Sequence, residues 1–186
     1  MAISEQDAGA PDALERLGLR VAACLDPDEV GRIAVLGLVA EFGAAFARLW
    51  LVGPGDLCDE CTMASTCENR EQCLHLAASE GISRNVDGAY RRVPFSNLKI
   101  GEIASRRESH WTNAVLQDPR VAHKEWAREH AQRSFAGYAL VVDGELLGVL
   151  ASFGKERLPA ETFRRLGVFA QLVAIALRNA RLFQQP

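Results

Sequence analysis

Residues 135–153, FAGYALVVDGELLGVLASF, consist of two apolar runs on either side of Asp143-Gly144. An Asp-Gly pair between two such runs is among the strongest short-range signals for a β-hairpin, because the tight two-residue turn needs positive φ angles. The sequence therefore predicts antiparallel strands at 135–142 and 145–153. We expect these two strands to complete a β-sheet.

Two further strands are predicted upstream, at 44–52 and 73–79. The sequence Gly-Pro-Gly-Asp at 53–56 ends the first of them as a turn. Without the residues in between, the two strands would form an ordinary hairpin. We therefore interpret 57–73 as a cysteine-rich insertion at a hairpin tip, with Cys73 on the returning strand.

Helices are predicted at both ends of the chain. Apolar residues recur at helical spacing in 12–25, and 28–42 is apolar nearly all round, so it must be covered on more than one side. The other predicted elements are a long last helix at 159–183, helices at 96–106 and 123–132, strands at 90–93 and 109–112, and a loop at 113–121. This order predicts an α+β fold with terminal helices packed on the sheet.

The last helix carries two apolar stripes. Their members are Leu166, Ala170, Val173, Leu177 and Ala180, and Phe169, Leu172, Ile175, Ala176 and Phe183. One stripe can cover the sheet, and the second needs another partner. Either the first helices of the same chain cover it, or a second copy does so in a helical dimer seam.

The composition is that of one soluble domain. The chain has 186 residues, 48% hydrophobic and 24% charged, and a net charge of −3, which suits one buried core and no nucleic-acid surface. Because Arg178 and Arg181 interrupt the last helix, we expect no run of membrane-spanning length. We expect a disordered lead at 1–11, a single domain at 12–186, a cytoplasmic location, and no membrane or direct nucleic-acid partner.

Four of the five cysteines lie within sixteen residues, with the spacing C-x2-C-x5-C-x5-C. They are Cys58, Cys61, Cys67 and Cys73. In a reducing compartment, clustered cysteines favour a metal over disulfides, and four thiolates suit zinc or an iron–sulfur cluster. The spacers contain few large apolar residues, so a metal centre would explain how this segment becomes ordered. Cys24, in the first helix, is expected to be a small core residue.

The identity of the centre stays open between an iron–sulfur cluster, structural zinc and no metal. The segment contains no histidine and its spacers are longer than those of zinc ribbons, which favours iron–sulfur. His75 is interpreted as a surface residue, with a role beside Cys73 as the alternative. We hypothesise that oxygen, nitric oxide or redox poise alters the centre, and that strain passes through Trp50 and Leu76 to the helices.

The order and spacing of these elements resemble a GAF domain, a small-molecule sensor module of signalling proteins. The segments that carry the resemblance are LERLGLRVAACLDPDEVGRIAVLGLVAEFGAAFARLWLV (14–52), CLHLAASEG (73–81), VPFSNLKIGEIASRRESHWTN (93–113) and DPRVAHKEWAREHAQRSFAGYALVVDGELLGVLASF (118–153). The cysteine-containing insertion is similar to that of GAF domains at the front of bacterial transcription activators and sensor kinases. Some cysteine-bearing members of that group are thought to hold iron–sulfur clusters.

The resemblance implies a central antiparallel sheet with the terminal helices on one face and a ligand pocket on the other. It implies pocket walls from 96–104, 111–118 and 123–138. The candidate pocket residues are Ile100, Trp111, Asn113, Trp126, Phe135 and Tyr138. From the second stripe of the last helix we expect a homodimer through the terminal helices, with a downstream or separate effector, such as a kinase or transcription activator.

The sequence favours a sensor over an enzyme, because it contains no nucleophile–base signature, phosphate-binding glycine loop or paired-carboxylate motif. The expected function is redox, oxygen or nitric oxide sensing through a four-cysteine iron–sulfur centre in signal transduction or transcription control. One alternative is a small-molecule-binding dimerisation module with a structural zinc-pinned loop. The other is a cysteine-dependent redox enzyme.

Overall fold

Six antiparallel strands form one sheet in the order β3-β2-β1-β6-β5-β4, in a computed structural model that describes residues 12–121 and 123–185. The strands are β1 (Phe46–Pro54), β2 (Gln72–Gly81), β3 (Arg92–Val93), β4 (His110–Thr112), β5 (Ser134–Val142) and β6 (Glu145–Gly154). The helices are α1 (Ala13–Ala22), α2 (Pro27–Phe42), α3 (Leu98–Arg106), α4 (Lys124–Glu129) and α5 (Ala160–Gln184), with short 3-10 turns η1 (Ala64–Thr66) and η2 (Val115–Gln117). The predicted lead at 1–11 lies outside the described residues.

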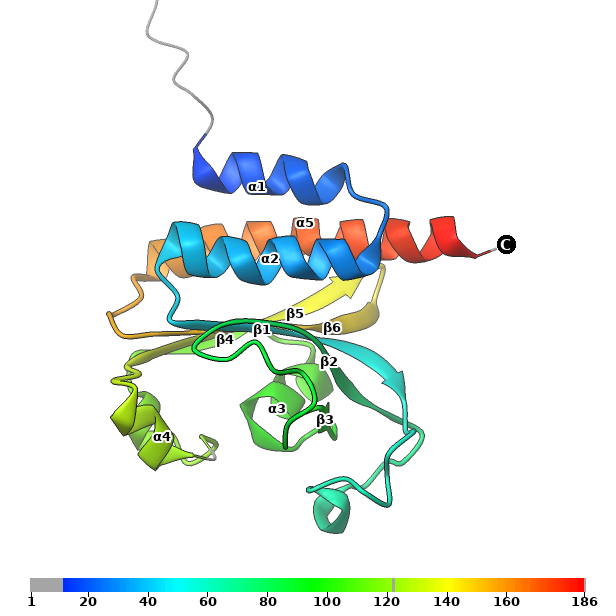
Figure 1. The fold of residues 1–186 in the computed structure, drawn as a ribbon, viewed down its shortest axis with the longest axis vertical. Helices are drawn as coiled ribbons and strands as arrows, with labels where there is room; N and C mark the ends of the chain where they lie inside the picture. Colours follow the sequence, from blue (N-terminus) through cyan, green and yellow to red (C-terminus); the bar gives the residue numbers. More distant parts are fainter. Residues whose placement is uncertain (1–11, 122, 186) are drawn as a thin grey trace, which may run out of the picture.

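The terminal helices α1, α2 and α5 lie on one face of the sheet, and α3 and α4 lie on the other side (Figure 1). The side chain of Asp12 caps α1 and that of Asp26 caps α2, each by accepting a hydrogen bond from a backbone N–H of the first turn. Gly43, with φ of 68°, ends α2. This arrangement confirms the predicted α+β fold.

The β5–β6 hairpin has the predicted two-residue turn. Asp143 and Gly144 both have positive φ, 49° and 78°, and Val142 pairs with Glu145. Strands β1 and β2 also pair, up to Gly53 opposite Cys73 and Pro54 opposite Gln72. The segment between them extends beyond the sheet at the end of this pair (Figure 1).

Alternation along β1 divides its side chains between two cores, as successive side chains of a strand point to opposite faces. Ala47 and Leu49 belong to the core under the terminal helices. Trp50 belongs to the second core, between the sheet and α3. The second face of the sheet is therefore apolar as well.

Helix α5 is long and apolar enough to cross a membrane by length and composition alone, contrary to the sequence expectation. Core helices of soluble proteins pass the same test. In this fold its first stripe is buried, together with Phe169 and Ala176 of the second, and the helix packs on α1, α2 and β5. Leu172, Ile175 and Phe183 of the second stripe are exposed, because the helices of the chain cover only part of it.

Candidate functional site

All four clustered cysteines line one small hollow between their loop and the segment around β3. The hollow has a volume of about 20 Å³, and its wall also contains Arg92 and Pro94. That is little more than the roughly 10–15 Å³ that one buried water needs. Its size therefore matches a single atom rather than a group of several.

Three of the thiols in this hollow donate hydrogen bonds to backbone carbonyls. Cys58 Sγ lies 3.6 Å from the carbonyl of Arg70, and Cys73 Sγ lies 3.7 Å from that of Pro54. Cys67 Sγ lies 3.2 Å from the carbonyl of Asn69. Burial raises the pKa of the Cys73 thiol to about 11, so this sulfur becomes a thiolate near neutral pH only if a cation compensates its charge.

The cysteine loop has no core of its own, as its sequence indicates. No residue between 57 and 72, all of which the structure describes, is fully buried. The loop is instead held from outside, since Thr62 Oγ1 donates to the carbonyl of Ala89 (3.0 Å) and Asn97 Nδ2 donates to Thr66 Oγ1 (2.5 Å). Both external contacts go to the chain on either side of β3.

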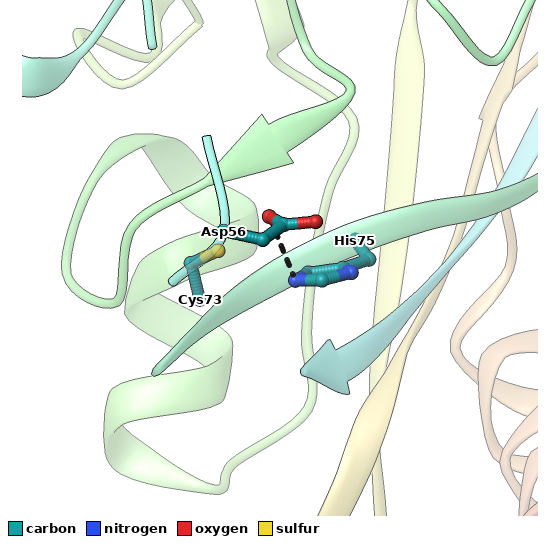
Figure 2. Close-up of side chains that lie close together, drawn as sticks. All are labelled: Asp56, Cys73 and His75. Atoms are coloured by element: carbon teal, nitrogen blue, oxygen red, sulfur yellow. Dashed lines mark ion pairs between the residues drawn. The ribbon is translucent and has the colours of Figure 1, made fainter. Parts of the chain in front are cut away.

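A second set of metal-type ligands lies beside Cys73. Figure 2 shows Asp56, Cys73 and His75 close together, and one ligand atom from each lies within 4.8 Å of the others. In the part of the chain that the structure describes, no other group of three or more such side chains meets this distance limit. The four cysteine sulfurs therefore do not all lie within 4.8 Å of one another. His75 Nε2 lies 2.7 Å from the carbonyl oxygen of Pro54 and 3.6 Å from Asp56 Oδ1.

The donor chemistry of the hollow fits a thiolate-bound centre. Four thiols line one space, on a loop that has no buried core of its own. The hollow is too small for a multi-atom cluster, and its sulfurs are too far apart for one ion, because four thiolates at about 2.3 Å from a tetrahedral ion lie about 3.8 Å from one another. The loop must therefore rearrange around either group. Cys58, Cys61, Cys67 and Cys73 would hold either group, with His75 as a neighbouring donor.

A much larger cavity, about 400 Å³, lies on the face of the sheet away from the terminal helices. This volume is within the range of small-molecule sites, about 300–1,000 Å³. Its lining combines aromatic, aliphatic and basic side chains with one serine: Phe46, Arg48, Trp50, Ser83, Tyr90, Val93, Leu98, Lys99, Ile100, Arg120, Val121, His123, Trp126, Ala127, Phe135 and Phe153. The cavity is therefore a second candidate site, separate from the cysteine hollow.

Three of the six candidate pocket residues line this cavity and three lie elsewhere. Ile100, Trp126 and Phe135 line it. The rings of Trp111 and Tyr138 stack on Phe163 of the terminal-helix side, at centroid distances of 5.6 and 5.1 Å. Asn113 binds the backbone N–H and carbonyl of Leu158.

Strand alternation explains this division. Phe135 and Tyr138 are an odd number of residues apart on β5, so they face opposite sides of the sheet. Trp111 pairs with Ala136, which belongs to the terminal-helix core. Phe46, Arg48 and Trp50 also line the cavity and were not among the predicted residues, although the same alternation on β1 places them on this face.

The expected route of strain through Trp50 and Leu76 to the terminal helices does not fit the structure. These residues pair across β1 and β2, and both belong to the core on the cavity side of the sheet. Their side chains therefore point away from the helices that were expected to receive the strain.

The two sites share one wall. Residues 89–98, which we call the bridging segment, receive the contacts that hold the cysteine loop, and Tyr90, Val93 and Leu98 of this segment line the cavity. Arg92 and Pro94 line the hollow. Strand alternation therefore aims Arg92 at the cysteines and Val93 at the cavity.

Comparison with known proteins agrees with this architecture. The family described as "GAF domain" matches residues 24–178. The fold is similar to the GAF domain of a phosphoenolpyruvate-protein phosphotransferase from Coxiella burnetii, with TM-score 0.70 and 20% identity over 92% of this chain and 94% of that one. No curated protein matches the sequence.

Two other solved structures come from different functional classes. Free methionine-R-sulfoxide reductase from Neisseria meningitidis, in complex with its substrate, has TM-score 0.70 and 18% identity over 97% of this chain and 99% of that one. Residues 122 to 287 of a methyl-accepting chemotaxis protein have TM-score 0.66 and 18% identity over 91% of this chain and 99% of that one. At these identities the likeness concerns the fold.

Proposed function

The chain belongs to the GAF-domain family, and from this premise we propose that it is a sensory domain of a signalling system whose cysteine loop holds an iron–sulfur centre. Zinc is the alternative occupant. The observation that carries the proposal is that Cys58, Cys61, Cys67 and Cys73 line one hollow on a loop without a core. When bound, such a centre supplies a crosslink whose integrity depends on oxygen, nitric oxide or redox poise.

The residues around the hollow give a path for the signal. Arg92 of the bridging segment binds Asp56 at the start of the loop, and Arg91 Nη2 lies 3.2 Å from Glu60 inside it. Loosening the loop removes these contacts and those from Thr62 and Asn97. The bridging segment would then shift, and with it the cavity wall formed by Tyr90, Val93 and Leu98.

Metal analysis tests this proposal directly. The protein is purified without air and assayed for iron, acid-labile sulfide, zinc and visible absorption. We expect iron and sulfide in equal amounts, lost from Cys61→Ser and retained in Cys24→Ser, because Cys24 is outside the hollow. Zinc alone would replace the redox proposal with a structural zinc site, and a metal-free protein would remove both.

A second candidate function is the binding of a small molecule in the cavity of about 400 Å³. The specific observation is that this space is lined by aromatic rings and basic groups on the face opposite the terminal helices. The two functions are compatible, because the bridging segment belongs to both sites. Ligand binding to metal-free protein would separate them.

We propose that the domain is not an enzyme, although some structural neighbours are methionine sulfoxide reductases. A reductase of that chemistry needs a reactive cysteine at its substrate. Among the described residues, those that line the large cavity include no cysteine. Turnover of free methionine sulfoxide with a thiol reductant would overturn this proposal.

We also propose a homodimer through α5 in a cytoplasmic protein that acts on a downstream or separate effector. Val168, Leu172, Ile175 and Leu182 are all exposed on α5. Together with Asn179 these residues are spaced alternately four and three residues apart, which is the spacing of a coiled-coil seam. A polar residue such as Asn179 within a seam specifies the register of the two helices. A second copy of the chain is therefore the proposed occupant of this stripe.

A further inference from the structure

Arg48 is a half-buried arginine on the cavity face of the sheet. It lies between Phe46 and Trp50 on β1, and strand alternation aims all three side chains at the cavity, whose wall they form. The guanidinium carbon lies 4.5 Å from the centroid of the Phe46 ring and 5.9 Å from that of Trp50. The charged group is thus held among aromatic rings.

One edge of this guanidinium is fixed by β2. Arg48 Nε donates to Ser79 Oγ at 3.2 Å, and Ser79 Oγ donates to the carbonyl of Ser83 at 2.6 Å. Because Ser79 occupies the Nε position, the two terminal nitrogens form the edge available to another partner. A guanidinium edge of this kind suits an oxygen anion.

No carboxylate of the described residues forms an ion pair with Arg48. The other strongly basic groups of the lining, Lys99 and Arg120, both pair with Asp118. Burial lowers the pKa of Arg48, because it removes the charged guanidinium from water. A buried cation without an anion is costly unless a ligand supplies one.

The rest of the cavity is suited to a flat apolar group. The rings of Phe46 and Trp126 lie 5.6 Å apart, Phe46 and Phe153 lie 6.2 Å apart, and Phe135 and Phe153 lie 5.0 Å apart. Aromatic rings at such distances favour further stacked or edge-on rings. None of the residues that line the cavity in the described structure is acidic.

We propose that this cavity binds a small aromatic carboxylate, whose carboxylate accepts hydrogen bonds from the terminal nitrogens of Arg48 and whose ring lies among Phe46, Trp126 and Phe153. The proposal rests on the second candidate function, binding in the cavity, and is independent of the cysteine centre. Arg48 supplies charge and orientation, while the rings supply apolar contact. An acid should therefore bind far better than its uncharged amide.

The first experiment uses the unaltered full chain. Benzoate, 4-hydroxybenzoate and indole-3-acetate are titrated by calorimetry, with tryptophan fluorescence as a second readout because Trp50 and Trp126 line the cavity. Each acid is compared with its amide. We expect at least one acid to bind at least about tenfold more tightly than its amide, because the amide leaves the buried charge of Arg48 unpaired.

Failure of all three acids, or equal binding of acid and amide, would overturn the carboxylate proposal. Tight binding of the amides alone would refute the carboxylate proposal but support the second candidate function, the binding of a small molecule in the cavity. Failure of acids and amides together, with an intact fold, would count against both.

Variants assign the charge to Arg48. Arg48→Gln should weaken the acid by about tenfold or more and leave the amide unchanged, and Arg48→Lys should recover part of the loss because it restores charge without the flat edge. Arg32→Gln is the matched control, since Arg32 is an exposed arginine of α2 that pairs with Glu29. Unchanged acid binding in a folded Arg48→Gln protein would refute the assignment.

Discussion

The Arg92 guanidinium donates two hydrogen bonds to the Asp56 carboxylate, from Nε to Oδ1 and from Nη2 to Oδ2, each at 2.7 Å. This pair closes the start of the cysteine loop against β3. Asp56 also lies beside Cys73 and His75 (Figure 2). The Arg92 hydrogen bond holds the pKa of Asp56 well below its usual range. Asp56 is therefore a carboxylate at neutral pH, and its place is set by the strand that also forms the cavity wall.

Replacing Arg92 tests whether this pair supports the cysteine centre. Arg92→Gln removes the paired charge beside Cys73, and we expect metal affinity to fall by about tenfold or more, as for other groups that orient a metal site. The measurement is competition with a chelator. Arg84→Gln, at an exposed arginine paired with Glu80, is the control. Equal metal retention in both variants would show that Arg92 does not support the centre.

Gly55 tests the packing of the loop without changing a ligand. A Cβ at this position would lie 1.7 Å from the carbonyl oxygen of Arg70 and 3.0 Å from Cys58 Sγ. Because backbone must move to admit it, Gly55→Ala should lose most of the bound metal while the melting of the rest of the domain changes little.

Gly88→Ala is the matched control, because a Cβ there meets only Asn85 at an ordinary 3.5 Å. Metal content and circular dichroism melting are measured for both proteins. A fully loaded Gly55→Ala protein would show that the hollow in its present form is not the metal site.

Asp118 tests the buried ion network at the edge of the cavity. Lys99 and Asp118 side chains are only 4% and 8% exposed, and Arg120 also binds Asp118. Asp118→Asn leaves the Lys99 charge buried without its partner, so the free energy of unfolding should fall by about 3 kcal/mol at pH 7. Urea denaturation measures this change, with Glu161→Gln, from an exposed pair with Arg164, as control.

The stability difference between the unaltered protein and Asp118→Asn should depend on pH. Burial by itself raises the pKa of Asp118, but the hydrogen bonds of Arg120 and Lys99 outweigh it and lower the pKa overall. A lowered pKa in the folded state contributes stability above the unfolded value, about 3.9, and this contribution is lost as pH falls toward the folded value. The difference between the two proteins should therefore shrink below about pH 4, and a constant difference would contradict this linkage.

Tyr138→Phe tests the division of the sheet into two faces. Tyr138 Oη donates to the carbonyl of Phe163 at 3.1 Å on the terminal-helix side. Loss of this bond should lower the free energy of unfolding by about 1 kcal/mol. Ligand binding in the cavity should be unchanged, in contrast to Phe135→Leu, which alters the cavity lining. A loss of binding in Tyr138→Phe would contradict this assignment of faces.

The fold was predictable because its signals are local. The Asp143-Gly144 turn specifies one hairpin, and the apolar pattern of 28–42 specifies a helix covered on several sides, as α2 is by the sheet, α1 and α5. The face of each side chain also follows from alternation, which separates Phe135 from Tyr138. The resemblance alone combined them in one pocket.

The site was less predictable because it depends on contacts between distant segments. Arg48 is oriented by Ser79, its register partner on the next strand, just before a register shift between Leu49 and Trp50. The cysteine spacing identified the four residues that line the hollow, but a loop without a core carries no signal for where its sulfurs lie. Their placement depends on the bridging segment.

Ile175→Glu tests the proposed dimer seam on α5. Ile175 is 41% exposed within one chain, so the charge should leave the monomer folded while it prevents apolar packing against a second copy. We expect light scattering to report the mass of two chains for the unaltered protein and of one chain for the variant. Leu25→Glu is the control, because Leu25 is similarly exposed, at 47%, but lies off the stripe. A monomeric unaltered protein, or equal dissociation of both variants, would contradict the dimer seam. The exposed residues of α5 would then serve another contact, and the signal would leave the domain by a different route.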